Sequence, residues 1–262
     1  MAFEWRPVDL ARISSYLGYI WIFDIQRAEG RKLAGSDDGG WPRWSGKGDE
    51  IAYSKRTKEG SALMRQAIDS GRIQRRISFF DFLVTPSSWS PDDRVLAIYS
   101  FRQGRFGFVA TDDDSEPDWV DAQGAQLVHP KFSPDGRWVA YLSNVTGASE
   151  VWVRSYPDGS GARQVSVGGG AEPLWCTKCN ELFFRNGNRW LASHVSLEPE
   201  LSLEPARLLF ETEYIDTPGV SYDVSSDGQR LFVVKTVEPN SRTEIRIITA
   251  FFDQLTRLVP TD

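Results

Sequence analysis

A chain of 262 residues is long enough to bury a sizeable core, and 40% apolar with 25% charged residues is an ordinary globular composition. The net charge of −6 argues against a nucleic-acid partner, because such domains are usually basic. No apolar run approaches the ~20 residues of a membrane helix. The first residues also lack the basic and apolar regions of a signal peptide. We therefore expect no membrane contact by this chain, which could still be one part of a larger membrane protein.

A large apolar residue precedes a tight turn six times along the chain. These anchors are Trp5, Trp44, Trp89, Phe132, Trp175 and Val224, with separations of 39, 45, 43, 43 and 49 residues. An apolar run follows each turn and predicts a strand at 10–14, 51–54, 95–100, 138–143, 182–185 and 231–234. After a loop comes a third predicted strand, at 20–25, 63–68, 106–110, 151–155, 190–195 and 244–250. A period near 40–45 residues with a strand–turn–strand centre is typical of a propeller blade.

The clearest copy is residues 129–143, HPKFSPDGRWVAYLS. Its turn is Ser-Pro-Asp-Gly, in which Pro134 presets φ, Asp135 can bond nearby backbone and Gly136 can adopt a positive φ. The following run, 138–142, is apolar at every position. That pattern predicts a strand covered on both faces.

The repeats predict an all-β fold, a single six-bladed β-propeller of four-stranded antiparallel blades spanning residues 1–262. The expected repeats are approximately 1–38, 39–82, 83–126, 127–169, 170–216 and 217–262. The first copy lacks the turn glycine, so five blades are the alternative. Residues 250–259 carry apolar side chains largely on one helical face and predict a short C-terminal helix.

Acidic residues recur in the turns, at Asp92, Asp135 and Asp227. Equivalent turns of different blades point outward at separate places, so these carboxylates cannot converge on one ion. We interpret them as hairpin chemistry and expect no metal and no cofactor.

Two cysteines, Cys176 and Cys179, occupy the turn of the fifth copy. Free thiols, a disulfide across the hairpin and part of a metal site with His194 are all compatible with C-x-x-C. Free thiols are the favoured interpretation, because a zinc site needs four ligands and a redox pair needs a helix N-terminus.

The sequence gives little support for nucleophilic catalysis, because the whole chain contains two histidines and has no G-x-S-x-G elbow. We expect no catalytic residue. The loops that lead into the first strand of each blade bring aromatic and acidic side chains to one face, a composition typical of interfaces. The candidate ligand-binding residues at this face and channel mouth are Trp41, Asp81, His129, Glu172, Tyr222 and Asp223.

The repeats WSPDDRVLAIYS (89–100) and FSPDGRWVAYLS (132–143) resemble those of TolB-type β-propellers. The segments 172–195, 205–211, 222–234 and 245–260 resemble, in that order, the C-terminal propeller of bacterial membrane-bound serine/threonine protein kinases. The resemblance implies a six-bladed sensory or protein-binding module and supplies no catalytic residue.

The predicted function is therefore a non-catalytic binding or sensory scaffold, a monomer, in a bacterial signalling protein, with a protein or small-molecule ligand. One alternative is the substrate-gating propeller of a prolyl-oligopeptidase-like hydrolase. Another is a stand-alone hydrolase or lyase with His129, Glu172 and Asp223 at the channel. The compartment is periplasmic or extracellular if the chain belongs to a membrane kinase, and cytoplasmic if it is free-standing.

Overall fold

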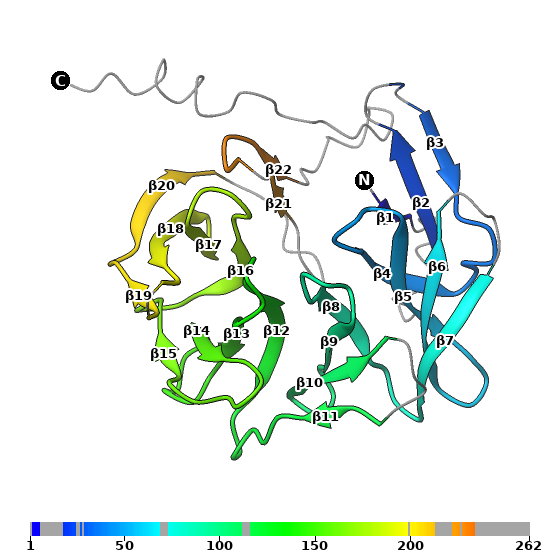
Figure 1. Cartoon of the computed structure of the whole chain (residues 1–262), viewed down its shortest axis with the longest axis horizontal. Helices are drawn as coiled ribbons and strands as arrows, with labels where there is room; N and C mark the ends of the chain where they lie inside the picture. The colour runs from blue at the N-terminus through cyan, green and yellow to red at the C-terminus, as the bar shows by residue number, and fades with distance from the viewer. Residues whose placement is uncertain are drawn as a thin grey trace. The chain divides into compact units, whose positions relative to one another are not determined.

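The computed structural model describes residues 2–5, 18–24, 27, 29–68, 73–111, 116–198, 200–212, 222–225 and 227–233. Within these residues every regular element is a β-strand (Figure 1), which confirms the all-β prediction. None of the described segments is a helix long and apolar enough to cross a membrane. The chain divides into two compact units, Met1–Phe132 and Ser133–Asp262.

The first unit carries three antiparallel sheets, in the orders β1-β2-β3, β4-β5-β6-β7 and β11-β10-β9-β8. Their strands are β1 (Ala2–Trp5), β2 (Tyr19–Asp24), β3 (Glu29–Lys32), β4 (Gly39–Trp44), β5 (Glu50–Arg56), β6 (Ser61–Ala67), β7 (Ile73–Phe80), β8 (Thr85–Trp89), β9 (Val95–Ser100), β10 (Arg105–Ala110) and β11 (Asp118–Trp119), followed by β12 (Leu127–Phe132).

The remaining sheets have the orders β12-β13-β14-β15, β16-β17-β18-β19 with β20 also paired to β18, and β21-β22. Their strands are β13 (Trp138–Ser143), β14 (Glu150–Ser155), β15 (Arg163–Gln164), β16 (Ala171–Trp175), β17 (Glu181–Asn186), β18 (Arg189–Ser196), β19 (Ser202–Leu203), β20 (Arg207–Glu211), β21 (Tyr222–Val224) and β22 (Leu231–Val233).

The six sheets of the described residues correspond one to one with the six sequence repeats. Three sheets follow the predicted four-strand path, and β9 and β13 begin and end at the predicted residues. The number of blades and the single-domain organisation stay predictions. The predicted strands at 10–14 and 244–250 and the predicted helix at 250–259 lie outside the described residues.

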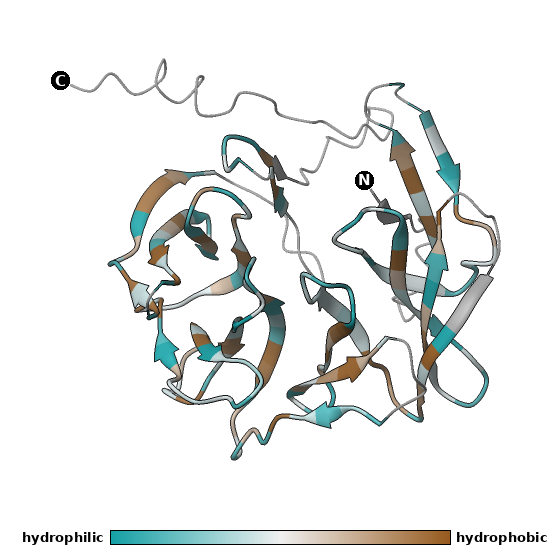
Figure 2. Ribbon diagram, viewed as in Figure 1, coloured by the Kyte–Doolittle hydropathy of each residue, from teal (hydrophilic) through white to brown (hydrophobic). Residues whose placement is uncertain are grey.

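Strands near the middle of the sheets are buried on both faces. Four successive residues of β9, Leu96 to Tyr99, are fully buried, as are Val139 and Ala140 of β13. This burial explains why the runs are apolar at every position rather than at alternate ones. In Figure 2 the apolar colouring falls mainly on strands, and β3, whose four residues are all exposed, is a hydrophilic exception.

The same hydrogen bonds close the hairpin turn in three repeats. In the fourth repeat, Ser133 Oγ donates to Asp135 Oδ1 at 2.6 Å and accepts from the Trp138 amide at 3.0 Å. Asp135 Oδ1 accepts from the Arg137 amide at 3.1 Å, and Gly136 has a φ of 74°. Ser90 with Asp92, and Ser225 with Asp227, repeat these contacts. We call this set the Ser–Asp turn network.

The network explains the turn carboxylates without a metal. The hydrogen bond from the serine hydroxyl is the largest cause that lowers the pKa of Asp92 and of Asp227 below its ordinary value. Within the described residues, no group of three or more His, Cys, Asp or Glu side chains is arranged to hold a metal ion.

A Ser133→Ala substitution should lower the free energy of unfolding by about 1–3 kcal/mol, because it leaves a buried amide without its side-chain acceptor. Ser133 is 1% exposed. Chemical denaturation of the full chain measures the loss, with Ser202→Ala at an exposed strand position as the matched control. Equal effects of the two substitutions would contradict a structural role for the network.

Candidate functional site

Three of the predicted site residues share an unusual backbone conformation. Trp41, His129 and Glu172 have φ values of 54°, 56° and 52°. Each lies three residues before the anchor of its repeat and is followed by proline. Non-glycine residues in the left-handed region are uncommon, and strained positions of this kind gather at binding and switch sites.

The strain coincides with irregular strand pairing. The register between β4 and β5 shifts between Gly40 and Arg43, and the register between β16 and β17 shifts between Ala171 and Leu174. Such bulges bend a strand and redirect its side chains. The first strand of each of these sheets is therefore bent at the predicted site residue.

In the first unit, the buried ring of His129 packs against two aromatic rings, one buried and one half-exposed. Its ring centroid is 4.9 Å from that of Tyr99 and 5.3 Å from that of Phe101. His129 is 7% exposed, whereas Phe101 is 50% exposed. Its Nδ1 atom has no hydrogen-bond partner among the described residues.

Two cations reach one backbone oxygen in the same unit. The ammonium of Lys131, itself 7% exposed, donates to the Ser87 carbonyl at 2.7 Å. Arg43 Nε donates to the same oxygen at 3.1 Å, and Arg43 Nη1 donates to the Pro42 carbonyl at 2.9 Å. We call Arg43, Ser87, His129 and Lys131 the cationic cluster.

The cluster keeps its imidazole neutral. Burial, together with the positive charges of Lys131 and Arg43, lowers the pKa of His129 to about 3. A histidine that resists protonation in the folded state destabilises that state wherever the unfolded chain takes up the proton.

The free energy of unfolding should therefore fall by roughly 1.5 kcal/mol as the pH drops from 6.5 to about 5, because the unfolded imidazole binds a proton that the folded one does not. The loss continues until the pH approaches the folded pKa. Denaturation at several pH values measures the slope, which His129→Gln should remove and His194→Gln should leave intact. A flat wild-type profile across this window would contradict a buried neutral imidazole.

In the second unit, Glu172 forms a buried two-pronged ion pair with Arg185. Arg185 Nη2 lies 3.0 Å from Glu172 Oε1, and Arg185 Nε lies 3.2 Å from Oε2, with both side chains at most 5% exposed. The Tyr222 hydroxyl donates to the Glu172 carbonyl at 2.8 Å. Burial raises the pKa of Tyr222 well above its ordinary value, so the phenol keeps its proton.

Glu172→Gln should lower the free energy of unfolding by about 3–5 kcal/mol, because it leaves the Arg185 charge buried without its carboxylate. The double variant Glu172→Gln/Arg185→Met should lose less than the sum of the two single variants. Glu211→Gln is the matched control. Its pair with Arg189 is exposed, and such pairs contribute less than about 1 kcal/mol. Strictly additive losses at Glu172 and Arg185 would contradict the pairing.

The set of predicted site residues also includes Trp41, Asp81 and Asp223. Trp41 is 6% exposed in β4, and Asp81 is exposed directly after β7. Asp223 is exposed and accepts a hydrogen bond from the Val224 amide at 2.9 Å. Among the described hydrogen bonds, the bond from the Tyr222 hydroxyl to the Glu172 carbonyl joins two of the six predicted site residues.

Sequence reasoning missed three members of the cationic cluster. Arg43 and Lys131 both stand immediately before the anchor of their repeats, and each follows a proline. An alignment of the repeats on that proline would have shown two cations at one structural position. Ser87 gave no sequence signal, because it contributes its backbone carbonyl.

An open cleft of about 420 Å³ lies elsewhere in the first unit, between the β9–β10 turn and the segment before β12. Arg102, Arg105 and Asp121 supply its charged walls. No predicted site residue lines it.

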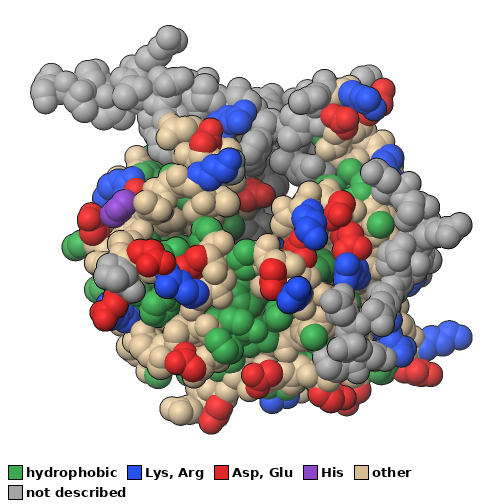
Figure 3. All heavy atoms as spheres, viewed as in Figure 1, with side chains coloured by type: hydrophobic (Ala, Val, Ile, Leu, Met, Phe, Trp, Pro, Cys, Tyr) green, Lys and Arg blue, Asp and Glu red, His purple; other side chains and the backbone are tan. Residues whose placement is uncertain are grey.

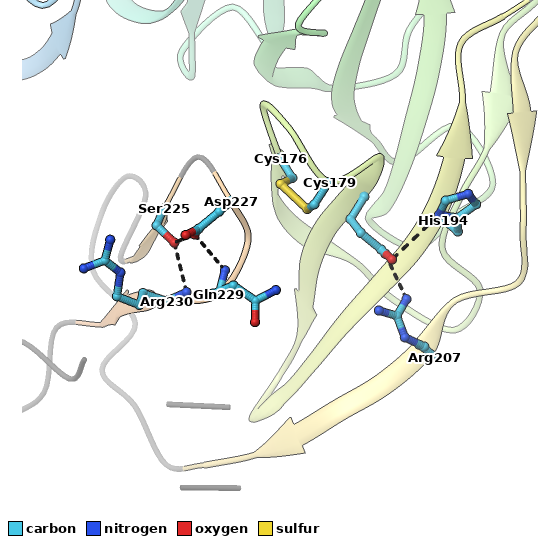
Figure 4. The surroundings of a disulfide bond; sticks show 9 residues. Cys176, Cys179, His194, Arg207, Ser225, Asp227, Gln229 and Arg230 are labelled. Atoms are coloured by element: carbon cyan, nitrogen blue, oxygen red, sulfur yellow. Dashed lines mark hydrogen bonds and ion pairs between the residues drawn. A yellow bond between two sulfur atoms is a disulfide. The ribbon is translucent and has the colours of Figure 1, made fainter. Parts of the chain in front are cut away.

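The cysteines form a disulfide, which was not the favoured interpretation of the sequence. Cys176 and Cys179 are joined by an S–S bond of 2.09 Å in the turn between β16 and β17 (Figure 4). Nearby, Gly228 of the following repeat has a φ of 72°, and a Cβ atom on it would lie 2.5 Å from Cys179 Sγ.

His194 and Arg207 both lie close to the carboxylate of Glu181. His194 Nδ1 is 3.8 Å and Arg207 Nη1 is 2.8 Å from this carboxylate.

The family model of the TolB β-propeller domain matches residues 38–256. This chain belongs to that family. The TolB-type resemblance of the repeats is thereby confirmed. The Tol-Pal system protein TolB of Anaeromyxobacter dehalogenans (strain 2CP-C) is 30% identical over 119 residues, which cover 44% of this chain and 26% of that protein.

Solved TolB propellers show the same fold. TolB from Acinetobacter baumannii superposes with a TM-score of 0.65 at 16% identity, over 84% of this chain and 54% of that one. A putative TolB from Agrobacterium tumefaciens gives 0.61 at 17% identity, over 74% of each chain. The matched part spans about a quarter of the length of the curated TolB relatives.

Proposed function

We infer that this chain is a non-catalytic propeller that binds a ligand. The ligand contacts the bent residues near the start of the first strand of a sheet and the loops beside them. The observation that carries this function is the strained residue before proline, repeated as Trp41, His129 and Glu172. Three repeats hold three different side chains at one structural position on a shared scaffold. Function in widespread folds resides in such variable positions.

A protein is the favoured ligand, because TolB relatives are named as parts of the Tol-Pal system. The surface around Asp81 supports this choice, since Phe79 and Leu83 beside it are 38% and 36% exposed. Aromatic residues are enriched at protein interfaces. On the face seen in Figure 3, basic and acidic side chains are interspersed, so a partner would meet both signs of charge.

The finer proposal is a monomeric sensory propeller of a bacterial signalling protein. The resemblance of residues 172–195 and 222–234 to the propellers of membrane-bound serine/threonine kinases supports it. In such a protein the propeller would lie outside the membrane, and ligand binding would bias the kinase on the other side. Trp41, Asp81, His129, Glu172, Tyr222 and Asp223 remain the proposed contact residues.

A photo-crosslinking amino acid at position 81 tests the proposed function in cells that produce the full chain. We expect a discrete adduct with a partner, and Phe79→Ala should reduce its yield roughly tenfold if the ring is an interface hot spot. The matched control is position 47, since Lys47 is exposed in the β4–β5 turn at the opposite end of the same sheet.

Indistinguishable adducts at positions 81 and 47, or none at position 81, would contradict binding at the loop face. Turnover by the purified chain on a panel of ester, peptide and lactone substrates would contradict a non-catalytic role.

A further inference from the structure

The open cleft of the first unit lies between two walls, the turn from β9 to β10 and residues 120–126, which lead into β12. The Leu127 amide donates to the Gly104 carbonyl at 2.7 Å, so a backbone hydrogen bond joins the two walls. Asp121 Oδ1 accepts from the Gln123 amide at 3.0 Å, which holds the second wall in shape. The cleft is therefore a defined feature of this unit.

Two arginines of the first wall bring positive charge to the cleft. Arg105 Nε donates to the Gln103 side-chain oxygen at 2.7 Å, and its guanidinium carbon lies 4.5 Å from the centroid of the Trp119 ring. Both of these partners are uncharged. Arg102 is exposed, and its guanidinium makes no hydrogen bond or ion pair among the described residues. Asp121 pairs with neither arginine in the described part of the chain, so the walls have a net positive charge although the whole chain has a charge of −6.

These charges indicate an anionic ligand. A guanidinium offers a planar fork of N–H donors that matches the oxygens of an acidic group, and such charge-assisted hydrogen bonds are stronger than neutral ones. The Trp119 ring and the Gln103 oxygen hold Arg105 in place without neutralising its charge. Little side-chain freedom is therefore lost when an anion binds to Arg105.

The form of the cleft and a neighbouring aromatic ring indicate a protein as the source of that anion. Sites for small molecules bury most of the surface of their ligand, which an open cleft does not do. Phe101 belongs to the same turn as Arg102 and is 50% exposed, with its ring centroid 4.9 Å from that of Tyr99. Aromatic and arginine side chains are enriched at protein interfaces. The anions that a protein partner presents are the carboxylates of its aspartate and glutamate residues.

A layer of aromatic rings connects the cleft with the proposed contact residue Asp81. Trp119, which contacts Arg105, has its ring centroid 6.1 Å from that of Phe80 and 6.2 Å from that of Phe82. Asp81 stands between these two phenylalanines in the sequence. The cleft thus adjoins the surface at which the proposed function places its partner.

We propose that the cleft binds an acidic segment of a protein partner. Carboxylates of the segment pair with Arg102 and Arg105, and an apolar side chain next to them packs on Phe101. The proposal deepens the binding function inferred above and rests on it, because the segment belongs to the protein partner of that function. It adds the chemistry of the partner and a contact surface that no predicted site residue lines.

Indole NMR of the full chain, labelled on tryptophan, tests the proposal. Trp119→Phe assigns the Trp119 signal among those of the ten tryptophans, and this ring reports on Arg105, which it contacts. The probe is an acetylated, amidated peptide of one leucine followed by four alternating aspartates and glutamates. It should move the Trp119 signal to saturation, whereas the same peptide with asparagine and glutamine in place of the acids should leave the signal unmoved. Succinate, a small dicarboxylate, is titrated in parallel.

Arg102→Gln should weaken the apparent affinity for the acidic peptide about tenfold, which is the loss expected for one hydrogen bond between charged groups. Arg56→Gln is the matched control, because Arg56 is exposed at the end of β5, where the equivalent turn of the preceding repeat begins, and does not line the cleft. Chemical denaturation should give the same curve for Arg102→Gln and wild type, since this guanidinium has no hydrogen bond or ion pair within the described residues. Lost binding is thereby separated from misfolding.

Saturation by the acidic peptide at a lower concentration than succinate supports a protein segment as the occupant. Saturation by succinate at the same or a lower concentration would assign the cleft to a small acid and overturn the proposal. An unmoved Trp119 signal, an equal response to the amide peptide, or equal affinities of Arg102→Gln and Arg56→Gln would also overturn it. If the adduct at position 81 persists in any of these cases, the binding function stands and only the acidic segment falls.

Discussion

The Ser–Asp turn network is the local constraint on which three of the sheets depend, those of the third, fourth and sixth repeats. A serine hydroxyl and an aspartate carboxylate satisfy backbone amides at the tip of the hairpin, so the pairing of the first two strands has a defined starting point. Register follows from that point, and a slip of one residue would turn every side chain to the other face. In the fourth repeat the bent residue His129, three positions before the anchor, is located by the same register. In that repeat the scaffold and the candidate site are therefore linked through one short turn.

Much of the fold could be predicted because its rules are local. A Ser-Pro-Asp-Asp turn before β9 and a Ser-Pro-Asp-Gly turn before β13, each followed by a continuous apolar run, predicted the bounds of these strands, because turn chemistry and burial on both faces each leave a direct mark on the sequence. The strands of the first repeat were harder to predict, because the segment after its anchor Trp5 has no turn glycine. In the structure, β1 pairs with β2, from Trp5 with Tyr19 to Ala2 with Ile22, so the partners are 14 to 20 positions apart in the sequence.

The site could be predicted only in part. His129, Glu172 and Tyr222 were identified from their place before or within a first strand, but their neighbours were not. After a bulge the alternation of side chains along a strand no longer holds, so the direction of Arg43 does not follow from counting residues. The pairing of Glu172 with Arg185 likewise depends on the irregular register between β16 and β17. The same structural position thus carries a neutral imidazole beside two cations in one repeat and a neutralised carboxylate in another.

The disulfide and Gly228 show that neighbouring repeats are not interchangeable parts. Any side chain at position 228 would collide with the sulfur atoms of the preceding repeat, where Cys176 and Cys179 replace the usual turn residues. The glycine of the sixth repeat therefore packs closely against the disulfide of the fifth. An engineered exchange that brought in a different sixth repeat would therefore have to keep a glycine at this turn position for as long as the fifth repeat carries the disulfide.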